Sequence, residues 1–378
     1  MQVERKVYRE DHEQFRATAR RFIEREVVPH MDQWLKDGIV SREVWMKAGR
    51  EGLLCTMLPV EHGGGGGDFG HSAIIAEELA RAGASVSFGL HSDIVAPYIA
   101  RLGTEAQQQR WLPGICSGEQ ILAVAITEPG GGSDVKAIRT SAVRDGDDYV
   151  INGSKTFISN GFISDLVVVV CKTDPAAGAK GVSLVVVETN REGFRRGRKL
   201  DKVGMHSQDT AELFFDNVRV PVANRLGEEG KGFAYLMQEL PQERFIIAVT
   251  AAAKLERLLE QTLEYVKDRK AFGQTVWDFQ NTKFRLADVK AKAVALRTMV
   301  DHYLAEHMRR KLTAEEAAIA KLYATETLWQ CLDDMVQLHG GYGYMLEYPI
   351  ARAFVDMRVS RVYGGSNEVM RDLISRKL

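Results

Sequence analysis

The pattern of apolar residues changes twice along the chain, and these changes limit the folds that it can adopt. Residues 11–100 carry apolar side chains at helical spacing. From Ile121 onward, short β-branched runs alternate with turn signals such as Asp145-Gly146, which is typical of antiparallel strands. After Gly232 the strand pattern ends and long amphipathic helical patterns return. Runs of one type of element favour segregated domains over alternating βαβ units.

We therefore predict an α+β chain of three domains. An N-terminal all-α domain is expected over residues 1–120, a middle antiparallel β domain over 121–228, and a C-terminal four-helix bundle over 229–378. Breaks between the long C-terminal helices are expected at Phe272-Gly273, near Leu312-Thr313 and at Gly340-Gly341.

Composition excludes several classes of function. The 378 residues carry 50 Lys+Arg and 51 Asp+Glu, and no basic stretch is interleaved with aromatics, which argues against a nucleic-acid partner. The four cysteines lack the spacing of metal or redox motifs, so we interpret them as buried apolar residues of a protein from a reducing compartment. No apolar run approaches about 18 residues and the first residues carry both charge signs, so we expect neither a membrane span nor a signal peptide.

One glycine cluster suggests a nucleotide enzyme. Gly65, Gly67 and Gly70 have the spacing of a dinucleotide-binding loop, follow an apolar stretch and precede a helical pattern. This alternative predicts a Rossmann-type NAD enzyme. The acidic residue expected about 20 residues later is missing from RAGASVSFGL, so a surface turn is the favoured interpretation.

A second glycine cluster, TEPGGGSD, spans Thr127–Asp134 and follows an apolar strand. Glycines let backbone N–H groups approach a ligand closely, and loops on β scaffolds often bind ligands, but a capped turn fits equally well. In the later segment GSKTFISNG, the residues alone predict an exposed Lys155 and a core Phe157.

The C-terminal region contains a charged pair, Glu243-Arg244, which we expect at the head of an apolar helix. By itself this pair is typical of a helix start with a salt bridge. Arg269 is expected to end a helix and His339 to pack or cap. No metal-ligand spacing, nucleophile elbow or phosphate-binding Gly-Lys-Ser/Thr loop is present, so no metal site is expected.

In their order and spacing, these segments resemble the acyl-CoA dehydrogenase family. The motifs are TEPGGGSD, GSKTFISN, YVKDRKAFGQ, QLHGGYG and YGGSNEVM, spread over nearly the whole chain, and LPQER adds similarity to the long-chain branch. The resemblance implies the acyl-CoA dehydrogenase fold, non-covalent FAD, a homotetramer, and transfer of electrons to electron-transfer flavoprotein.

The resemblance also implies site residues. It places FAD against Val124, Ile126, Thr127, Gly132, Ser133, Phe157, Ile158, Ser159, Arg269, Phe272, Gln280, Gln337, Gly340, Gly341, Ser366, Asn367 and Glu368. Among these, Arg269, Phe272, Gln280 and the segment Gln337–Gly341 would serve the cofactor of a neighbouring subunit. The acyl-CoA substrate is expected against Ser133, Ala234, Pro241, Gln242, Arg244, Gly364 and Gly365.

The position of the base is implied by a departure from part of the family. In the medium- and short-chain branches a glutamate follows the tyrosine of the terminal motif, where this chain has Gly364. In the long-chain and isovaleryl branches the glutamate precedes an arginine, as Glu243 precedes Arg244. Glu243 would thus remove the α-proton while the β-hydride passes to flavin N5, which gives a trans-2-enoyl-CoA. Ala234 stands where long-chain relatives have tyrosine, which leaves the acyl preference open.

Several alternatives remain. The chain could be an acyl-CoA oxidase that uses oxygen or a dehydrogenase of branched or cyclic acyl groups. From a different class, it could be a flavin-binding or partner-binding protein without catalysis. The expected role is fatty-acid β-oxidation or related acyl-CoA catabolism. A bacterial cytoplasm is the expected location, with the mitochondrial matrix as the alternative for a trimmed chain.

Overall fold

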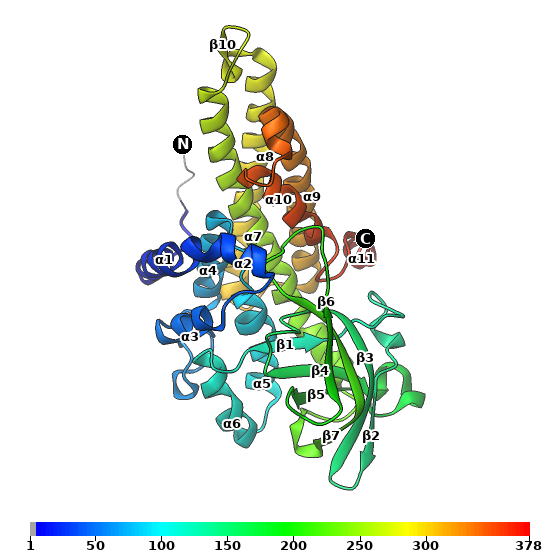
Figure 1. The fold of residues 1–378 in the computed structure, drawn as a ribbon. Helices are drawn as coiled ribbons and strands as arrows, with labels where there is room; N and C mark the ends of the chain where they lie inside the picture. Colours follow the sequence, from blue (N-terminus) through cyan, green and yellow to red (C-terminus); the bar gives the residue numbers. More distant parts are fainter. Residues whose placement is uncertain (1–4) are drawn as a thin grey trace.

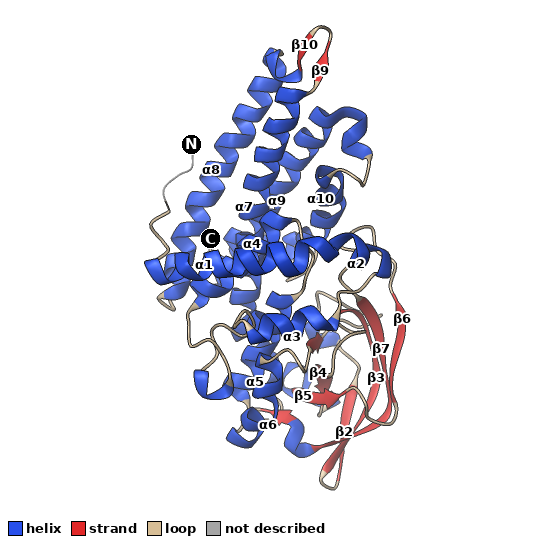
Figure 2. Cartoon of the chain, turned by 60° about the vertical axis from the view of Figure 1, so that its left-hand side comes forward, coloured by secondary structure: helices blue, strands red, loops and turns tan. Residues whose placement is uncertain are grey.

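The computed structural model describes residues 5–378 as two helical regions with a β-sheet between them in sequence (Figure 1). The predicted order of α, β and α regions is confirmed. Figure 2 shows most strands in the lower half, toward one side, a small two-stranded hairpin at the top, and the long helices forming the upper half. Among the described residues, no helix has both the length and the apolar character needed to cross a membrane.

The N-terminal region consists of short helices. They are α1 (Glu10–Phe22), α2 (Met31–Asp37), α3 (Arg42–Arg50), α4 (Phe69–Ala82), α5 (Ala96–Leu102) and α6 (Glu105–Cys116), with π-helical turns η1 (Ile23–Val27) and η4 (Leu90–Val95). Helix α4 is capped by Asp68, whose carboxylate accepts the N–H of Gly70 at 2.9 Å.

The dinucleotide-binding alternative fails in this region. Turns and bends, not a strand, lead into Gly65–Gly70, and a Cβ at Gly65 would lie 2.8 Å from the Thr56 carbonyl oxygen. These glycines therefore allow the chain to fold back on itself closely. The favoured interpretation as a turn agrees with this packing.

The middle region is a mixed sheet. Its strands are β1 (Leu122–Ala125), β2 (Ser141–Asp145), β3 (Asp148–Ser159), β4 (Leu166–Lys172), β5 (Val182–Glu188), β6 (Phe194–Lys199), β7 (Thr210–Pro221) and β8 (Arg225–Leu226). The order is β6-β7-β3-β2-β4-β5-β8, with β1 beside β4. The sheet departs from the purely antiparallel prediction because β1 runs parallel to β4, and β2 meets β4 in parallel at Ser141 and Lys172.

Strand β4 separates two apolar cores. All of its residues are buried, and their side chains alternate between the two sides. Val168 and Val170 belong to a large core that runs through all three regions, whereas Val167 and Val169 belong to a smaller core within the sheet domain. The four cysteines are buried in these cores, as predicted.

The C-terminal region is built from three long helices and two short ones. They are α7 (Gly232–Asp268), α8 (Gln280–Met308), α9 (Ala314–His339), α10 (Pro349–Met357) and α11 (Asn367–Ser375), with a hairpin of β9 (Lys270–Ala271) and β10 (Gln274–Thr275) after α7. The three predicted helix breaks are confirmed. The start of α7 was predicted wrongly: the helix begins at Gly232, so Glu243 lies in its interior, two residues after Pro241.

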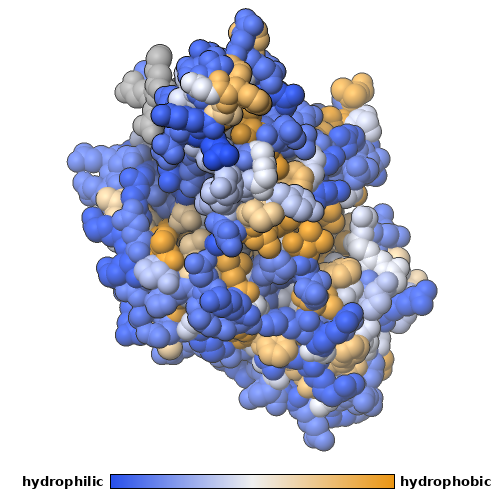
Figure 3. All heavy atoms as spheres, turned by 45° about the horizontal axis from the view of Figure 1, so that its top comes forward, coloured by the Kyte–Doolittle hydropathy of each residue, from blue (hydrophilic) through white to orange (hydrophobic). Residues whose placement is uncertain are grey.

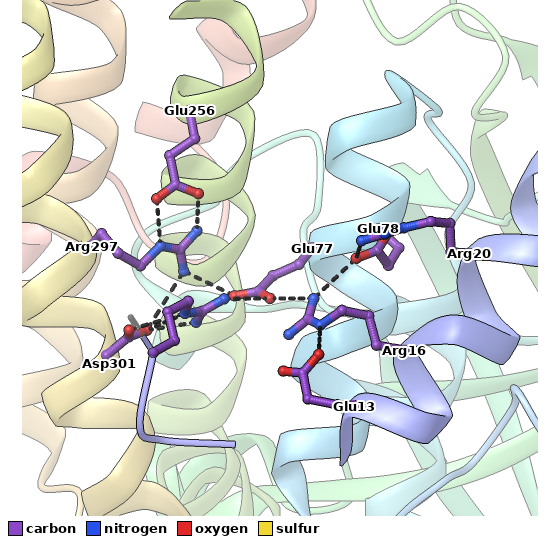
Figure 4. A network of polar contacts seen from close by, with 9 residues as sticks. Glu13, Arg16, Arg20, Glu77, Glu78, Glu256, Arg297 and Asp301 are labelled. Carbon is purple, nitrogen blue, oxygen red and sulfur yellow. Dashed lines mark hydrogen bonds and ion pairs between the residues drawn. The ribbon is translucent and has the colours of Figure 1, made fainter. Parts of the chain in front are cut away.

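A buried ionic network ties the first helix to the long ones (Figure 4). Glu77 on α4 accepts hydrogen bonds from Arg5 at 2.8 Å, Arg16 at 2.9 Å and Arg297 at 2.9 Å. Burial raises the pKa of Glu77, but the charges of Arg297 and Arg5 outweigh it and bring the pKa down to about 2. The network joins residues up to 296 positions apart in sequence, Arg5 and Asp301.

Candidate active site

The loop after β1 is folded by a buried acid that the sequence analysis did not single out. Glu128 accepts backbone N–H groups from Arg139 at 2.7 Å and Thr140 at 2.9 Å, and pairs with the Lys155 ammonium at 2.8 Å. The glycines that follow remain open: nothing lies within 4 Å of a Cβ at Gly130. The loop therefore exposes its glycine backbone, while the bonds of Glu128 hold the start of the loop in place.

The end of β3 lies against the same loop, since the Thr156 N–H donates to the Thr127 carbonyl at 2.9 Å. Both predictions made from residues alone were wrong here: Lys155 is fully buried and Phe157 is 68% exposed. The pairing of β3 with β7 has a register shift between Lys155 and Ile158. A bulge there interrupts the alternation of side chains between the two faces, which explains why Lys155 is buried and Phe157 is exposed. Phe157 has a φ of 59°, a strained conformation for a non-glycine residue.

The other residues expected at the flavin in this region differ in exposure. Val124, Ile126, Thr127 and Ser159 are half-buried, and Gly132 and Ser133 are exposed. The side chain of Ile158 is buried in the sheet core, so only its backbone is available to a ligand.

Glu243 is half-buried in the interior of α7. Burial raises the pKa of its carboxyl to about 6, although the neighbouring Arg244 charge opposes the shift. The Arg244 side chain is buried and donates from Nε to the Gly364 carbonyl at 3.2 Å. The helix thus supplies a carboxylate in an apolar setting and, beside it, a guanidinium that binds the terminal loop.

The loop Tyr363–Ser366 meets α7 at Glu243. Gly364 has a φ of 65°, and a Cβ there would lie 2.6 Å from Ile247 Cδ1 and 3.9 Å from Glu243 Oε1. The structure therefore brings Glu243 directly against the glycine that replaces the terminal-motif glutamate. The Lys321 ammonium fixes the next residue by donating to the Gly365 carbonyl at 2.9 Å.

Two residues expected to contact ligands are turned inward. The Gln242 amide donates to the Asp93 carbonyl at 2.6 Å, and its oxygen lies 3.2 Å from His307 Nε2. The Asn367 side chain is buried and bonded to Lys321, Thr325 and Glu326. Their amides therefore position the chain instead of facing a ligand, because one residue of a helix turn faces the site while its neighbour faces the core.

The remaining terminal and α7 residues of the prediction stay near the site surface. Pro241, Gly365 and Ser366 are half-buried, while Ala234 and Glu368 are exposed. The first turn of α7 contacts the sheet domain, since the Lys136 ammonium lies 5.5 Å from the centre of the Phe233 ring.

A third group of predicted residues lies far from Glu243. Arg269 follows Glu243 by 26 residues, which places it about 39 Å away along α7. Arg269, Phe272, Gln280, Gln337, Gly340 and Gly341 are all exposed at the end of the long helices. The Arg269 guanidinium lies over the ring of Tyr342 at 5.5 Å, and His339 stacks on Tyr265 at 4.2 Å as a packed residue. One chain thus carries two separate sets of predicted ligand-binding residues, one near Glu243 and one at the far end of α7.

Cations near the first turn of α7 were missed by the sequence analysis. Lys136 in η5 (Val135–Ala137), Lys180 in η6 (Pro175–Gly181) and Lys231 before α7 are exposed, and no carboxylate pairs with them among residues 5–378. Their elements contact one another. Spacing gave no signal, because the three lysines come from separate segments of the chain.

One cluster outside the site has potential metal ligands. Atoms of Asp11, His12 and His71 lie within 4.8 Å of one another. The Arg9 guanidinium already pairs with Asp11 and Asp68 at 2.9 Å each, and Asp68 in turn bonds His12 at 2.8 Å. These contacts cap helices α1 and α4 and supply the local positive charge.

Comparison with known proteins identifies the family. Models of the acyl-CoA dehydrogenase N-terminal, middle and C-terminal domains match residues 9–119, 123–218 and 230–378. The chain is 49% identical over 377 residues to the long-chain specific acyl-CoA dehydrogenase of Sus scrofa mitochondria, covering 99% of this chain and 88% of that protein.

Solved structures agree with this result. The acyl-CoA dehydrogenase of Geobacillus kaustophilus has a TM-score of 0.97 at 50% identity, with 99% of each chain covered. A glutaryl-CoA dehydrogenase of Mycobacterium smegmatis in complex with FADH2 has a TM-score of 0.92 at 26% identity, covering 98% of this chain and 95% of that one. Three domain models in order, together with relatives at half identity over almost the full length, show that this chain belongs to the acyl-CoA dehydrogenase family.

Proposed function

We propose that this chain is an FAD-dependent acyl-CoA dehydrogenase of the long-chain type, with Glu243 as the base. The carrying observation is the contact between Glu243 and Gly364, with 3.9 Å from Oε1 to the position of a Cβ. The Glu243 carboxylate lies beside the position from which the side chain of a glutamate at residue 364 would extend, as in the branches that carry a glutamate there. The reaction converts an acyl-CoA to a trans-2-enoyl-CoA.

The residues of the sheet domain fit FAD. An exposed aromatic ring on a strained backbone, as at Phe157, offers an apolar face to a flat ligand. The open backbone at Gly130 and Gly132 and the hydroxyls of Thr127 and Ser133 offer hydrogen bonds to polar ring edges or phosphate. When bound, FAD supplies the acceptor for the β-hydride.

Glu243 and its neighbours carry out the proton transfer. A thioester α-proton is a weak acid, so a glutamate carboxylate at its ordinary pKa of 4.5 is a poor base for it. Burial raises the Glu243 pKa to about 6, which makes its carboxylate more basic. Arg244 donates to the Gly364 carbonyl and so keeps the loop close to α7. A thioester can then lie against the loop backbone beside Glu243.

The three unpaired lysines would bind the charged end of the substrate. Coenzyme A carries several phosphate charges, and Lys136, Lys180 and Lys231 stand where α7 enters the sheet domain. The acyl end would then continue past Glu243. This arrangement gives the charged and apolar ends of the substrate separate surfaces.

We further propose a homo-oligomer in which each cofactor contacts two chains. The distal set at Arg269 lies about 39 Å along α7 from Glu243, too far to serve the same flavin within one chain. Large apolar side chains are exposed at this end, with Phe272 at 96%, Tyr344 at 85% and Leu346 at 55%. Figure 3 shows hydrophobic surface among hydrophilic atoms on the face tilted toward this end. Such exposure favours contact with a second copy.

The distal set gives a testable expectation for cofactor retention. Arg269→Ala should lower FAD affinity about 10- to 100-fold, because a charge-assisted bond to the pyrophosphate is lost. Flavin content and mass of the assembly are measured together. Arg309→Ala, at the far end of α8, serves as control and should retain flavin. Full flavin retention in Arg269→Ala would contradict the shared site.

The proposed base predicts a pH dependence. The carboxyl must be ionised to accept a proton, so the rate of flavin reduction by acyl-CoA should rise tenfold per pH unit below about 6 and level off above it. Stopped-flow bleaching of the bound flavin under anaerobic conditions measures this rate. A flat profile between pH 5 and 8 would contradict Glu243 as the base, and absence of bleaching would indicate a flavin-binding protein without catalysis.

The electron acceptor separates two versions of the function. Electron-transfer flavoprotein is the acceptor implied by the family resemblance, and oxygen is the alternative. Turnover in air without an added acceptor decides between them: release of stoichiometric hydrogen peroxide would favour an oxidase, and its absence a dehydrogenase.

A further inference from the structure

The carbonyl groups of Gly364 and Gly365 are held by cations from two different helices. Arg244 of α7 donates from Nε to the Gly364 carbonyl at 3.2 Å. Lys321 of α9 donates from Nζ to the Gly365 carbonyl at 2.9 Å. The two helices lie side by side (Figure 2). Two consecutive carbonyls of one loop are therefore tied to one pair of packed helices.

The loop needs such ties because its own sequence does not fix its backbone. Gly364 has a φ of 65° and Gly365 a φ of 88°, and both values lie in the left-handed region that glycine adopts readily. Glycine has many other conformations open to it, so two glycines in succession leave the path of the loop undetermined. A charge-assisted hydrogen bond to each carbonyl selects one path.

Lys321 is costly to keep in this position. Its side chain is 0% exposed, and its other acceptor is Asn367 Oδ1 at 2.7 Å. The two carboxylates whose charges act on it, Glu326 and Glu368, pair with arginines instead. A buried ammonium that binds only neutral acceptors carries a desolvation cost that an apolar side chain of similar volume would avoid. Its bond to Gly365 therefore points to a role beyond packing.

We infer that Lys321 is a positioning residue for removal of the α-proton, because it fixes the loop against which the thioester lies beside Glu243. This inference rests on the proposed function. Glu243 Oε1 lies 3.9 Å from the position of a Cβ at Gly364, so a movement of the loop changes the distance between the base and the α-carbon of the thioester. A misplacement of about 1 Å can reduce a rate about 100-fold.

The test measures flavin reduction in Lys321→Met. Methionine is unbranched and apolar, and it cannot donate to the Gly365 carbonyl. We expect the limiting rate of anaerobic flavin bleaching by dodecanoyl-CoA to fall about 10- to 100-fold, and the dissociation constant of the thioester to stay within about threefold. The limiting rate belongs to the flavin-loaded enzyme, so a loss of stability alone would lower the flavin content and not this rate.

Lys254→Met is the matched control. Lys254 is also a buried lysine, at 8% exposed, but it follows Glu243 by eleven residues in α7, about 16 Å along the helix axis. Its replacement should leave the limiting rate within about threefold. Equal reductions in Lys254→Met and Lys321→Met would show a general effect of removing a buried charge and would overturn the inference.

The ammonium also predicts a pH dependence that a packing role would not produce. Burial lowers the pKa of Lys321 to about 8, and the charged groups that face it are Arg244 of α7, Glu368 of α11, Glu326 of α9 and Arg361 of η10 (Arg358–Arg361). The two arginines lower the pKa further, and the two glutamates oppose them. The bond to Gly365 weakens when the ammonium loses its charge. The limiting rate of the unaltered enzyme should therefore fall about 3- to 10-fold between about pH 8 and 9.5, and Lys321→Met should show no such fall.

Each measurement can contradict the positioning role. A limiting rate in Lys321→Met equal to that of the unaltered enzyme would overturn the inference and leave the proposed function standing. The pH series uses the unaltered enzyme, so it decides the question even if Lys321→Met does not retain flavin: a rate that stays constant between about pH 7 and 9.5 would overturn the inference. Absence of bleaching in the unaltered enzyme would overturn the proposed function as well.

Discussion

Replacing Glu243 by glutamine should reduce the rate of flavin reduction by acyl-CoA about 10³- to 10⁴-fold, the upper range for loss of a general base. Glutamine has the same length and a similar helix propensity, and it cannot take up the α-proton at neutral pH. The interior position in α7 means that the helix itself should persist. Anaerobic stopped-flow bleaching measures the rate, and the flavin spectrum shows whether the cofactor remains.

The matched control is Glu239→Gln, one turn earlier in α7. Glu239 is a buried carboxylate that pairs with Arg101 at 2.8 Å. Its replacement should cost some stability and leave flavin reduction within about fivefold. If Glu243→Gln reduced flavin as fast as the control variant, another group would have to be the base.

Replacing Glu77 by alanine should lower the free energy of unfolding by about 3–5 kcal/mol, because it leaves buried guanidinium groups without their counter-ion. Arg297 is 3% exposed and would keep only its bonds to Glu256 and Asp301. The depressed pKa gives the sign with acid: the carboxylate contributes stability above its ordinary pKa of 4.5, and this contribution is lost as pH falls toward about 2. Thermal and urea unfolding measure both effects.

Glu13→Ala tests whether the effect belongs to burial or to ion pairing as such. Glu13 pairs with Arg16 at 3.1 Å in the same network, but its side chain is 54% exposed. Its removal should cost less than about 1 kcal/mol. If Glu13→Ala and Glu77→Ala lowered the free energy of unfolding by similar amounts, the burial of Glu77 would not explain its effect.

The arrangement of regions could be predicted from the sequence because it depends on local periodicity. Strand pairing over long range could not: nothing in residues 122–125 indicates that β1 lies parallel to β4. The start of α7 was misplaced because Pro241 usually ends or begins a helix, whereas here the helix continues through it. Lys155 and Phe157 exchanged places because a bulge breaks the alternation from which exposure is predicted.

The candidate site could also be predicted only in part, because some of its contacts join distant segments. The motif pattern pointed to Glu243 and Gly364 as partners, and the structure places them in contact. The inward orientation of Gln242 depends on contacts with Asp93 and His307, which come from distant segments.

The large core has a consequence for how such a chain can evolve. Three domain models match consecutive segments of the sequence, but the core that includes Val168 and Val170 takes residues from all three regions. The segments are therefore units of inheritance in the sequence and not units that could be exchanged or lost independently. A middle domain transplanted from a distant relative would have to bring a matching helical surface with it, so the three segments are expected to diverge together.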